Sequence, residues 1–206
     1  MLEVLQAGLE RLDIQAEKAL CRDYLRYIEL LAKWNVAYNL TAVKEPEAML
    51  NRHLLDSLSV HSFVKGEHCL DIGTGAGLPG MILALAQPEK HWTLLDSNQK
   101  KIRFLRHVIA ELTVDNVELV HARIETFKPV KEFDTIICRA FAPLPRMLEQ
   151  TQHLLTTANQ LLAMKGKQVE TEVDELGCHE FLIKLNDISL SGEEASAKLV
   201  QIRRSV

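Results

Sequence analysis

The sequence lacks the residue patterns that mark metal sites, disulfide frameworks and membrane spans. Its four cysteines are scattered without C-x-x-C spacing: Cys21, Cys69, Cys138 and Cys178. The eight histidines include no H-E-x-x-H motif. The longest obvious apolar run, Met81 to Ala86, is too short to cross a bilayer. We therefore expect no metal, no membrane partner and a reducing, cytoplasmic setting.

A signal peptide is also not expected, because charged side chains interrupt the first residues: Glu3, Glu10, Arg11, Asp13, Glu17 and Lys18. The formal net charge of −4 argues mildly against a general nucleic-acid binder. It does not exclude a modifying enzyme, which needs one basic face only. With 206 residues, the chain can bury roughly 70% of its unfolded surface, enough for one core with an appendage.

The spacing of apolar residues divides the chain into two parts. Over residues 1–64, large apolar residues recur every three or four positions, which predicts a helical extension whose third helix starts near Pro46. Over residues 65–206, short apolar runs alternate with amphipathic segments, which predicts an α/β domain with a mostly parallel sheet. The expected strands are Cys69–Ile72, Trp92–Leu95, Val117–Val120, Thr135–Cys138 and Gln160–Met164. The expected helices lie near Pro79–Gln87, Gln99–Leu112, Pro145–Leu155 and Gln168–Leu176.

The last forty residues contain two more strand-like runs, Phe181–Leu190 and Lys198–Arg203. A short polar segment, 191–196, separates them. A connection of that length favours antiparallel over parallel pairing. We therefore expect an antiparallel C-terminal strand beside the parallel sheet.

The stretch Cys69–Gly80 predicts a strand, a glycine-rich turn and a helix. Gly73, Gly75 and Gly77 lack the Cβ that disfavours positive φ, so the backbone can turn sharply and approach a ligand closely. Pro79 suits the first turn of the following helix, whose unpaired N–H groups would face that ligand. The pattern indicates a nucleotide-type site, with an ordinary tight turn as the alternative.

Two known patterns overlap in this turn. Gly75–Gly80 matches G-x-G-x-x-G, the dinucleotide fingerprint, so a nicotinamide-dependent oxidoreductase is one alternative. Asp71–Gly77 matches D-x-G-x-G-x-G, which resembles the first motif of class I S-adenosylmethionine (SAM)-dependent methyltransferases. The Asp71 carboxylate would repel a phosphate and attract the cationic amino-acid end and the sulfonium of SAM. We therefore expect SAM as the cofactor.

Charged side chains follow the predicted strands at the edge where a doubly wound sheet binds ligands. Asp96 ends the second strand, where a carboxylate can accept hydrogen bonds from ribose hydroxyls. It would otherwise stabilise the start of the next helix. The segment His121–Glu125 follows the third strand, close to the expected place of an adenine ring. Arg123, Arg139 and Lys165 follow three successive strands, and we expect them to converge on one rim.

A basic cluster accompanies the apolar stripe of the predicted helix Gln99–Leu112. The cluster comprises Lys100, Lys101, Arg103, Arg106 and His107. Almost no acidic residues accompany them in this helix. Such a cluster is either a solvated face or a contact surface for a phosphate backbone. The second interpretation makes Lys100, Lys101, Arg103 and Arg106 candidate RNA-binding residues.

The helical part contains two polar groups of interest. Arg52, His53 and Asp56 fall within one turn of the third helix, where an ion pair between Arg52 and Asp56 is the simplest interpretation. The stretch Trp34–Thr41 breaks the helical period and is dense in aromatic and amide side chains. Neither group alone indicates a function.

Taken in order, several of these segments resemble one known family. They are Lys33–Asn35 with Tyr38–Thr41, Arg52–Ser57, Asp71–Gly80, Leu95–Ser97, Lys101–Leu105, Arg139–Ala142 and Lys165–Gly166. In this order and spacing the chain is similar to the bacterial small-subunit rRNA guanine-N7 methyltransferases, also called glucose-inhibited division protein B. The resemblance extends from about Lys33 to Gly166 and is weaker at both ends.

The resemblance implies a monomeric, cytoplasmic class I methyltransferase with a Rossmann-like sheet. Its substrate would be N7 of one guanine in the decoding-region loop of 16S rRNA, within the small ribosomal subunit. The family's SAM pocket maps to Gly73, Leu78, Ile124, Glu125 and Arg139. The polar residues of its substrate cleft map to Asn39, His53, Asp56, Arg123 and Lys165.

Methylation at N7 fits a sequence without a clear nucleophile–base pair, because guanine N7 has a free in-plane lone pair. The enzyme must mainly hold that nitrogen in line with the methyl group. Phe141, Trp34 or Tyr38 would stack on the unstacked base. A non-catalytic RNA-binding module on the same scaffold is a further alternative.

Overall fold

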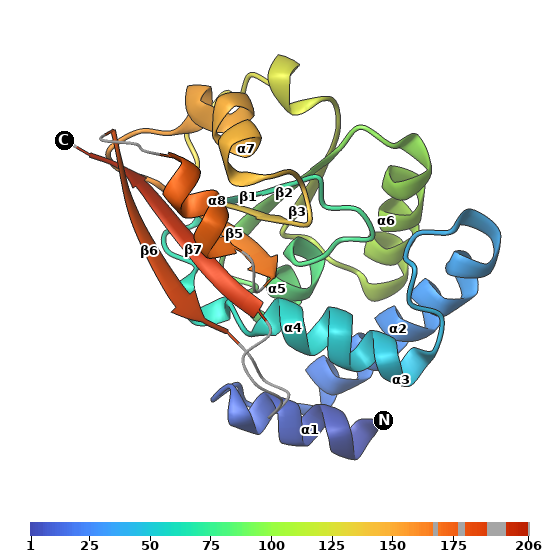
Figure 1. Ribbon diagram of the computed structural model, residues 1–206. Helices are drawn as coiled ribbons and strands as arrows, with labels where there is room; N and C mark the ends of the chain where they lie inside the picture. The colour runs from blue at the N-terminus through green and yellow to red at the C-terminus, as the bar shows by residue number, and fades with distance from the viewer. Residues whose placement is uncertain (167–168, 177–179, 189–196, 206) are drawn as a thin grey trace.

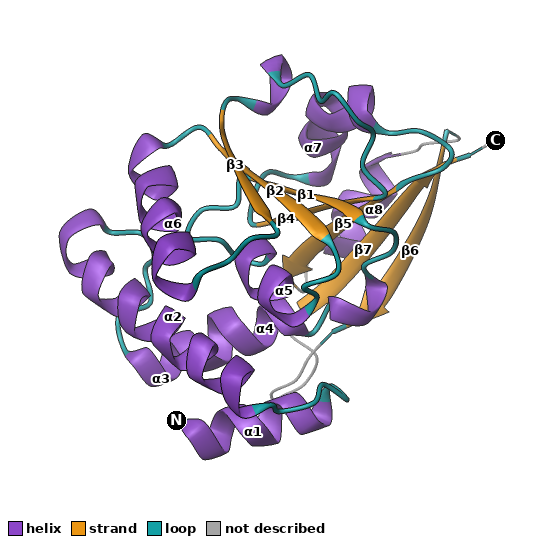
Figure 2. Ribbon diagram, turned by 180° about the vertical axis from the view of Figure 1, so that it is seen from behind, coloured by secondary structure: helices purple, strands orange, loops and turns teal. Residues whose placement is uncertain are grey.

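The computed structural model describes residues 1–166, 169–176, 180–188 and 197–205. A seven-stranded sheet runs through its centre with helices on both faces (Figures 1 and 2). The strands are β1 (His68–Ile72), β2 (His91–Asp96), β3 (Val117–His121), β4 (Thr135–Arg139), β5 (Gln160–Gly166), β6 (Phe181–Asp187) and β7 (Ala197–Arg204). Their order in the sheet is β3-β2-β1-β4-β5-β7-β6.

The first five strands are parallel, and β7 runs antiparallel to both β5 and β6. The five strands expected from the sequence are confirmed with ends that differ by at most two residues. The expected antiparallel pairing in the tail is confirmed as well. The segment 191–196, expected to join the two tail strands, lies outside the described residues.

Both faces of the parallel strands are buried, as is typical where helices cover each side. On β1, Cys69 packs in the layer formed with α5 (Gly80–Ala86) and α6 (Gln99–Leu112). Leu70 and Ile72 pack in the opposite layer, with α7 (Leu144–Thr151) and α8 (Val169–Leu176). The turn that follows β1 therefore lies at the centre of the sheet's carboxyl edge.

The first 64 residues are helical, as expected, but their third helix is not regular. After α1 (Leu2–Arg11) and α2 (Lys18–Tyr38), α3 (Pro46–Met49) continues as a π-helical turn, Leu50–Leu55, and ends as α4 (Asp56–Leu58). Arg52 and Asp56, both in the described part of the chain, form no ion pair. The wider π turn changes the i, i+4 geometry on which that simple interpretation depends.

Three helices differ in detail from the expected ones. Pro79 immediately precedes α5 instead of forming its first turn. The α7 segment is shorter than expected, because its last residues form a 3₁₀ turn, Gln152–Leu154. The α8 helix begins at Val169, and the expected start at Gln168 lies outside the described residues.

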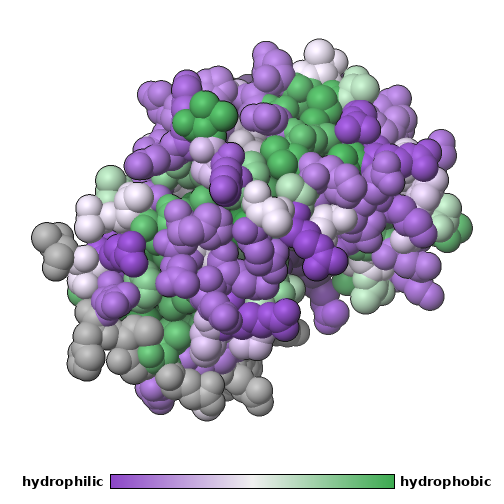
Figure 3. Space-filling model, turned by 90° about the horizontal axis from the view of Figure 1, so that it is seen from above, coloured by the Kyte–Doolittle hydropathy of each residue, from purple (hydrophilic) through white to green (hydrophobic). Residues whose placement is uncertain are grey.

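The molecular surface is mostly hydrophilic, with apolar groups between the polar ones on the face shown in Figure 3. In the described ranges, no helix combines the length and the apolar composition that a membrane span requires.

Candidate active site

The glycine turn has the backbone that the sequence predicts. Gly73, Gly75 and Gly77 have φ values of 65°, 63° and 91°. A Cβ on Gly73 would lie 2.8 Å from Cδ2 of Phe141, and one on Gly77 would lie 2.7 Å from Cδ2 of Leu105. Both the backbone angles and the close neighbours therefore require glycine.

The Asp71 carboxylate supports the turn from the side of α5. The side chain is fully buried, and its Oδ2 accepts hydrogen bonds from Thr74 Oγ1 at 2.6 Å and from the Gly80 N–H at 2.8 Å. Its Oδ1 is buried without a hydrogen-bond partner. Burial raises the pKa of Asp71 to about 7, although these hydrogen bonds and nearby Arg139 act in the opposite direction. Asp71 thus holds the turn in shape, and only its unpartnered oxygen is left for a cationic group.

Asp96 ties the end of β2 to the same turn. Its Oδ2 accepts a hydrogen bond from the Gly75 N–H at 2.9 Å, and its Oδ1 accepts one from the Asn98 N–H at 2.7 Å. Lys101 Nζ lies 3.7 Å from Oδ2. The carboxylate therefore connects the turn, the start of α6 and the adjoining cavity.

A cavity of about 440 Å³ opens between the carboxyl ends of β1, β2 and β4, and we call it the β2-side cavity. Its lining comprises Gly73, Leu95, Asp96, Ser97, Lys101, Ala122, Arg123, Ile124, Glu125, Ala140, Phe141, Ala142, Pro143, Arg146 and Gln150. It thus brings together four of the predicted cofactor residues, Gly73, Asp96, Ile124 and Glu125. The other five, all described, do not line it: Asp71, Gly75, Gly77, Leu78 and Arg139.

A second cavity, of about 270 Å³, lies on the other side of the end of β4, and we call it the β5-side cavity. Its lining comprises Asp56, Ser59, Arg139, Ala140, Met164, Lys165, Gly166, Ile188 and Ala197. Ala140 lines both cavities and has a φ of 50°, which is unusual for a residue with a Cβ. The next residue, Phe141, packs over Gly73. The two cavities therefore share Ala140, whereas Phe141 lines the β2-side cavity alone.

Arg139 is mostly buried among acidic and phenolic groups. One of its guanidinium nitrogens donates to the backbone oxygen of Arg52 at 3.2 Å. Burial lowers the pKa of Arg139, and nearby Tyr27, Asp56 and Asp71 raise it. No carboxylate of the described chain forms an ion pair with Arg139. Its remaining donors are therefore left for a ligand.

The expected convergence of three cations on one rim is only partly correct. Arg139 and Lys165 line the β5-side cavity, whereas Arg123 lines the β2-side cavity. Lys165 is also engaged: its Nζ donates to the backbone oxygen of Ala142 at 2.5 Å and to Glu172 Oε2 at 2.8 Å. Lys165 therefore holds the loop after β4 in place.

His53 is neutral and fully engaged. Its Nδ1 donates to the Arg52 backbone oxygen at 3.0 Å, and its Nε2 lies 2.6 Å from Thr41 Oγ1. Burial, reinforced by nearby Arg139, lowers its pKa to about 4. The Thr41 hydroxyl also accepts a hydrogen bond from the Val43 N–H. His53 therefore fixes the segment after α2 and cannot serve as a general base.

This burial predicts an acid-sensitive contribution to stability. Between its ordinary pKa of 6.5 and the folded value of about 4, the unfolded chain binds more protons at His53, so stability falls as the pH falls. Relative to the His53→Gln variant, we expect the wild type to lose on the order of 1 kcal/mol more unfolding free energy between pH 8 and pH 5. Urea unfolding at both pH values measures this difference, and equal losses would contradict the neutral buried imidazole.

The other predicted substrate residues lie at different places. Asp56 lines the β5-side cavity, and burial raises its pKa. Asn39 ends α2 in the left-handed conformation, with a φ of 49°, and its side chain is exposed. Asp56 forms no ion pair within the described chain. Only Asp56 of the two is therefore placed at a cavity.

The basic cluster of α6 faces solvent in part. Lys100, Arg103 and Arg106 are exposed, whereas Lys101 turns toward Asp96. Beside them, the ring of Trp34 stacks on Tyr38 at a centroid distance of 5.1 Å and packs against His107 at 5.3 Å. The ends of α2 and α6 thus form one surface that carries both aromatic and cationic side chains.

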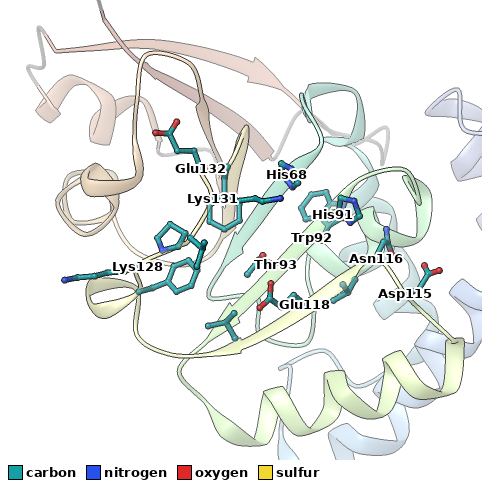
Figure 4. Close-up of a pocket in the computed structure, with 16 residues that line it drawn as sticks. His68, His91, Trp92, Thr93, Asp115, Asn116, Glu118, Lys128, Lys131 and Glu132 are labelled. Carbon is teal, nitrogen blue, oxygen red and sulfur yellow. The ribbon is translucent and has the colours of Figure 1, made fainter.

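Another cavity, of about 510 Å³, lies at the opposite edge of the sheet (Figure 4). It is lined by the first residues of β1, β2 and β3 and by the segment 127–133. His68 and His91 stack there with ring centroids 5.7 Å apart. Ligands of doubly wound sheets bind at the carboxyl ends of the strands, so this cavity is not the cofactor site.

Sequence reasoning missed the residues that support the site from outside its motifs. Glu172 accepts hydrogen bonds from Lys165 Nζ and from the Leu144 N–H, and Tyr27 donates to the backbone of the glycine turn. Glu172 lies in an acidic helix and Tyr27 in an apolar stripe, so neither carries a local signal. Thr74 lies inside the glycine motif, and its hydroxyl donates a hydrogen bond to Asp71. The spacing of the two residues in the sequence does not predict this bond.

The fold resembles solved methyltransferases at low sequence identity. It aligns with a glycopeptide N-methyltransferase in complex with SAM at a TM-score of 0.62 and 12% identity, over 73% of this chain and 94% of that one. It aligns with the Pyrococcus abyssi tRNA (uracil-54, C5)-methyltransferase, in complex with S-adenosyl-L-homocysteine, at a TM-score of 0.54 and 21% identity, over 71% and 36% of the two chains. The sheet order and the glycine turn define a class I, Rossmann-like SAM-dependent methyltransferase.

Closer relatives define the family. The family model described as rRNA small subunit methyltransferase G matches residues 20–199. The ribosomal RNA small subunit methyltransferase G of Chromohalobacter salexigens is 44% identical over 201 residues, 98% of this chain and 96% of that protein. The protein of the same name from Hahella chejuensis is 39% identical over 203 residues, 98% and 94% of the two chains. The chain belongs to the rRNA small subunit methyltransferase G family. It is a SAM-dependent methyltransferase, and a nicotinamide-dependent oxidoreductase finds no support in these matches.

Proposed function

We propose that this methyltransferase transfers the methyl group of SAM to N7 of one guanine in the decoding-region loop of 16S rRNA. The observation that carries the proposal is that the two cavities share Ala140 in their lining, with Phe141 next to it on the wall of the β2-side cavity. The β2-side cavity adjoins the glycine turn and suits the cofactor. The β5-side cavity suits the flipped guanine. The reacting atoms would meet where the two cavities join.

The residues present fit SAM. Gly73 lines the β2-side cavity without a side chain, so its backbone can approach a ligand there closely. Asp96 borders the β2-side cavity and offers a carboxylate to ribose hydroxyls. Asp71 does not line this cavity, and it contributes by holding the turn in shape through Thr74 Oγ1 and the Gly80 N–H. When bound, SAM supplies an electrophilic methyl group.

The chain's own residues then have to bind and orient the guanine. N7 carries a free lone pair, so the transfer needs no proton acceptor, in agreement with the engaged, neutral His53. Holding the nitrogen in line with the methyl group is worth roughly 7–11 kcal/mol of the barrier. The task of the β5-side cavity is therefore orientation and exclusion of water.

Arg139 and Phe141 are the best candidates for this orientation. Arg139 retains unused guanidinium donors at the β5-side cavity, and guanine O6 is an acceptor that arginine commonly reads. Phe141 lines the β2-side cavity next to the shared residue Ala140, and stacking of its ring on the base would be worth about 1–3 kcal/mol. Trp34 and Tyr38 already stack on each other and suit a more distant part of the RNA. Lys165, paired with Glu172, stabilises the loop that carries Phe141.

Charge reversal on α6 tests the RNA-binding surface. We expect the double variant Lys100→Glu, Arg103→Glu to weaken rRNA binding at least about tenfold, because each exposed cation contributes to phosphate binding. Binding of SAM should not change. The matched control is Lys128→Glu, Lys131→Glu, which changes the net charge equally on exposed residues at the opposite edge of the sheet. Equal losses of RNA affinity in both double variants would make the α6 cluster an ordinary solvated face.

The reaction is tested with labelled SAM and unmodified small-subunit rRNA or subunits, followed by aniline cleavage to map 7-methylguanine. We expect one labelled guanine within the decoding-region loop. Label at another atom or in another rRNA segment would overturn the assignment. Binding of RNA without any methyl transfer would instead favour a non-catalytic module.

A further inference from the structure

Two tyrosines of α2 reach the core of the methyltransferase through their hydroxyl groups. Tyr27 Oη donates to the backbone oxygen of Ala76 at 2.7 Å, and Tyr24 Oη donates to that of Ile82 at 3.1 Å. Both side chains are fully buried. Ala76 lies inside the glycine turn, whereas Ile82 lies within α5. The two residues therefore make the same kind of bond to different parts of the core.

The bond to Ala76 matters more to the local backbone than the bond to Ile82. Within the turn, the N–H groups of Gly77 and Leu78 both donate to the Thr74 oxygen. The Ala76 oxygen accepts from neither of these groups and takes its hydrogen bond from Tyr27. A carbonyl inside an α-helix, such as that of Ile82, has a partner in the helix itself. Loss of the Tyr27 hydroxyl thus leaves a turn carbonyl without its donor.

The direction of the Tyr27 hydroxyl is fixed by its surroundings. Its ring packs against Phe104 of α6 with a centroid distance of 6.2 Å, and Phe104 packs against Trp34 at 5.7 Å. Burial raises the pKa of Tyr27, so the hydroxyl remains a donor at physiological pH. The phenol is therefore rigid as well as protonated.

We propose that Tyr27 is a positioning residue for the cofactor: from the N-terminal helical part it fixes the Ala76 peptide and thereby the shape of the turn that receives SAM. The hydroxyl does not touch SAM. It acts through the backbone between Gly73 and Leu78, where the carboxylate of Asp96 also binds, at the Gly75 N–H. The proposal rests on the glycine turn as the cofactor site and is independent of which RNA atom is methylated.

The test compares Tyr27→Phe with Tyr24→Phe, because each variant removes one buried hydroxyl from the same helix. We expect Tyr27→Phe to weaken binding of SAM and S-adenosylhomocysteine about three- to tenfold in calorimetric titrations without RNA, as the loss of one hydrogen bond predicts. Tyr24→Phe should change the affinity less than twofold. The melting temperature of each variant checks that both remain folded.

Hydrogen exchange of the Gly77 and Leu78 amides provides a second measurement, independent of the ligand. Tyr27→Phe should accelerate their exchange several-fold, whereas Tyr24→Phe should not. The proposal is overturned if Tyr27→Phe binds SAM as the wild type does, or if Tyr24→Phe weakens binding equally. Because RNA takes no part in the experiment, a failure of the guanine-N7 assignment would leave this result unchanged.

Discussion

Replacing Gly73 with valine is expected to abolish measurable SAM binding. A Cβ at this position would lie 2.8 Å from Cδ2 of Phe141, and the φ of 65° is strongly unfavourable for a β-branched residue. Either Phe141 or the turn must move, and Gly73 and Phe141 both line the β2-side cavity. Backbone strain of about 1–3 kcal/mol adds to the lost contacts with the ligand. Together these effects predict an affinity at least about 100-fold lower.

Calorimetric titration with SAM, together with thermal unfolding, measures this effect. Gly166→Val is the matched control, because a Cβ there meets no described atom within 4 Å and the residue lies outside the β2-side cavity. Gly73→Ala, with a smaller side chain, should fall between the valine variant and the wild type. A folded Gly73→Val protein that binds SAM within a few-fold of the wild type would contradict the cofactor site.

The fold was predictable because its signals are local and repeat along the chain. The alternation of short apolar runs with amphipathic segments indicates parallel strands with helical crossovers, and β1 to β5 follow it. Positive φ at Gly73, Gly75 and Gly77 was predictable for the same reason, since glycine is the residue that adopts it without strain. The alternation of apolar and amphipathic segments thus identifies the sheet, and the glycines identify its central turn.

The irregular part of the helical extension was not predictable from spacing. The segment Leu50–Leu55 has apolar residues at positions compatible with an α-helix, yet it forms a π turn. In that turn, His53 contacts Thr41, a residue that precedes it by a loop and a helix. Contacts of this kind depend on tertiary packing, and no local pattern records them.

The roles of the site's charged residues were only partly predictable. Position at strand ends correctly placed Asp96, Arg123 and Arg139 at cavities. It did not reveal that Lys165 is paired with Glu172, since that pairing depends on how α8 packs beside β5. A sequence pattern identifies which charged side chains lie at the carboxyl edge of the sheet. Their ion-pair and hydrogen-bond partners in the folded protein decide which of these side chains remain available to a ligand.

Arg139 is the charge that remains available, and replacing it with methionine is expected to have the second large effect. The guanidinium lies among Tyr27, Asp56 and Asp71. Burial raises the pKa of both carboxyl groups, and the nearby positive charge of Arg139 opposes that rise. Methionine keeps much of the apolar volume but removes the donors and the charge. We expect the methylation rate at saturating SAM to fall by about 100-fold or more, as for other sites that lose one donor to the reacting group.

The conservative variant separates charge from geometry. Arg139→Lys retains the cation but not the planar pair of donors, so we expect a rate between those of the wild type and Arg139→Met. Arg22→Met is the control, because the Arg22 side chain is 75% exposed and pairs with the neighbouring Asp23. Single-turnover methylation of small-subunit rRNA measures the rate, and urea unfolding measures stability. If Arg139→Met methylates at nearly the wild-type rate, orientation of the guanine must depend on other groups of the β5-side cavity. If Arg139→Lys restores the full rate, a point charge suffices and the guanidinium fork does not read O6.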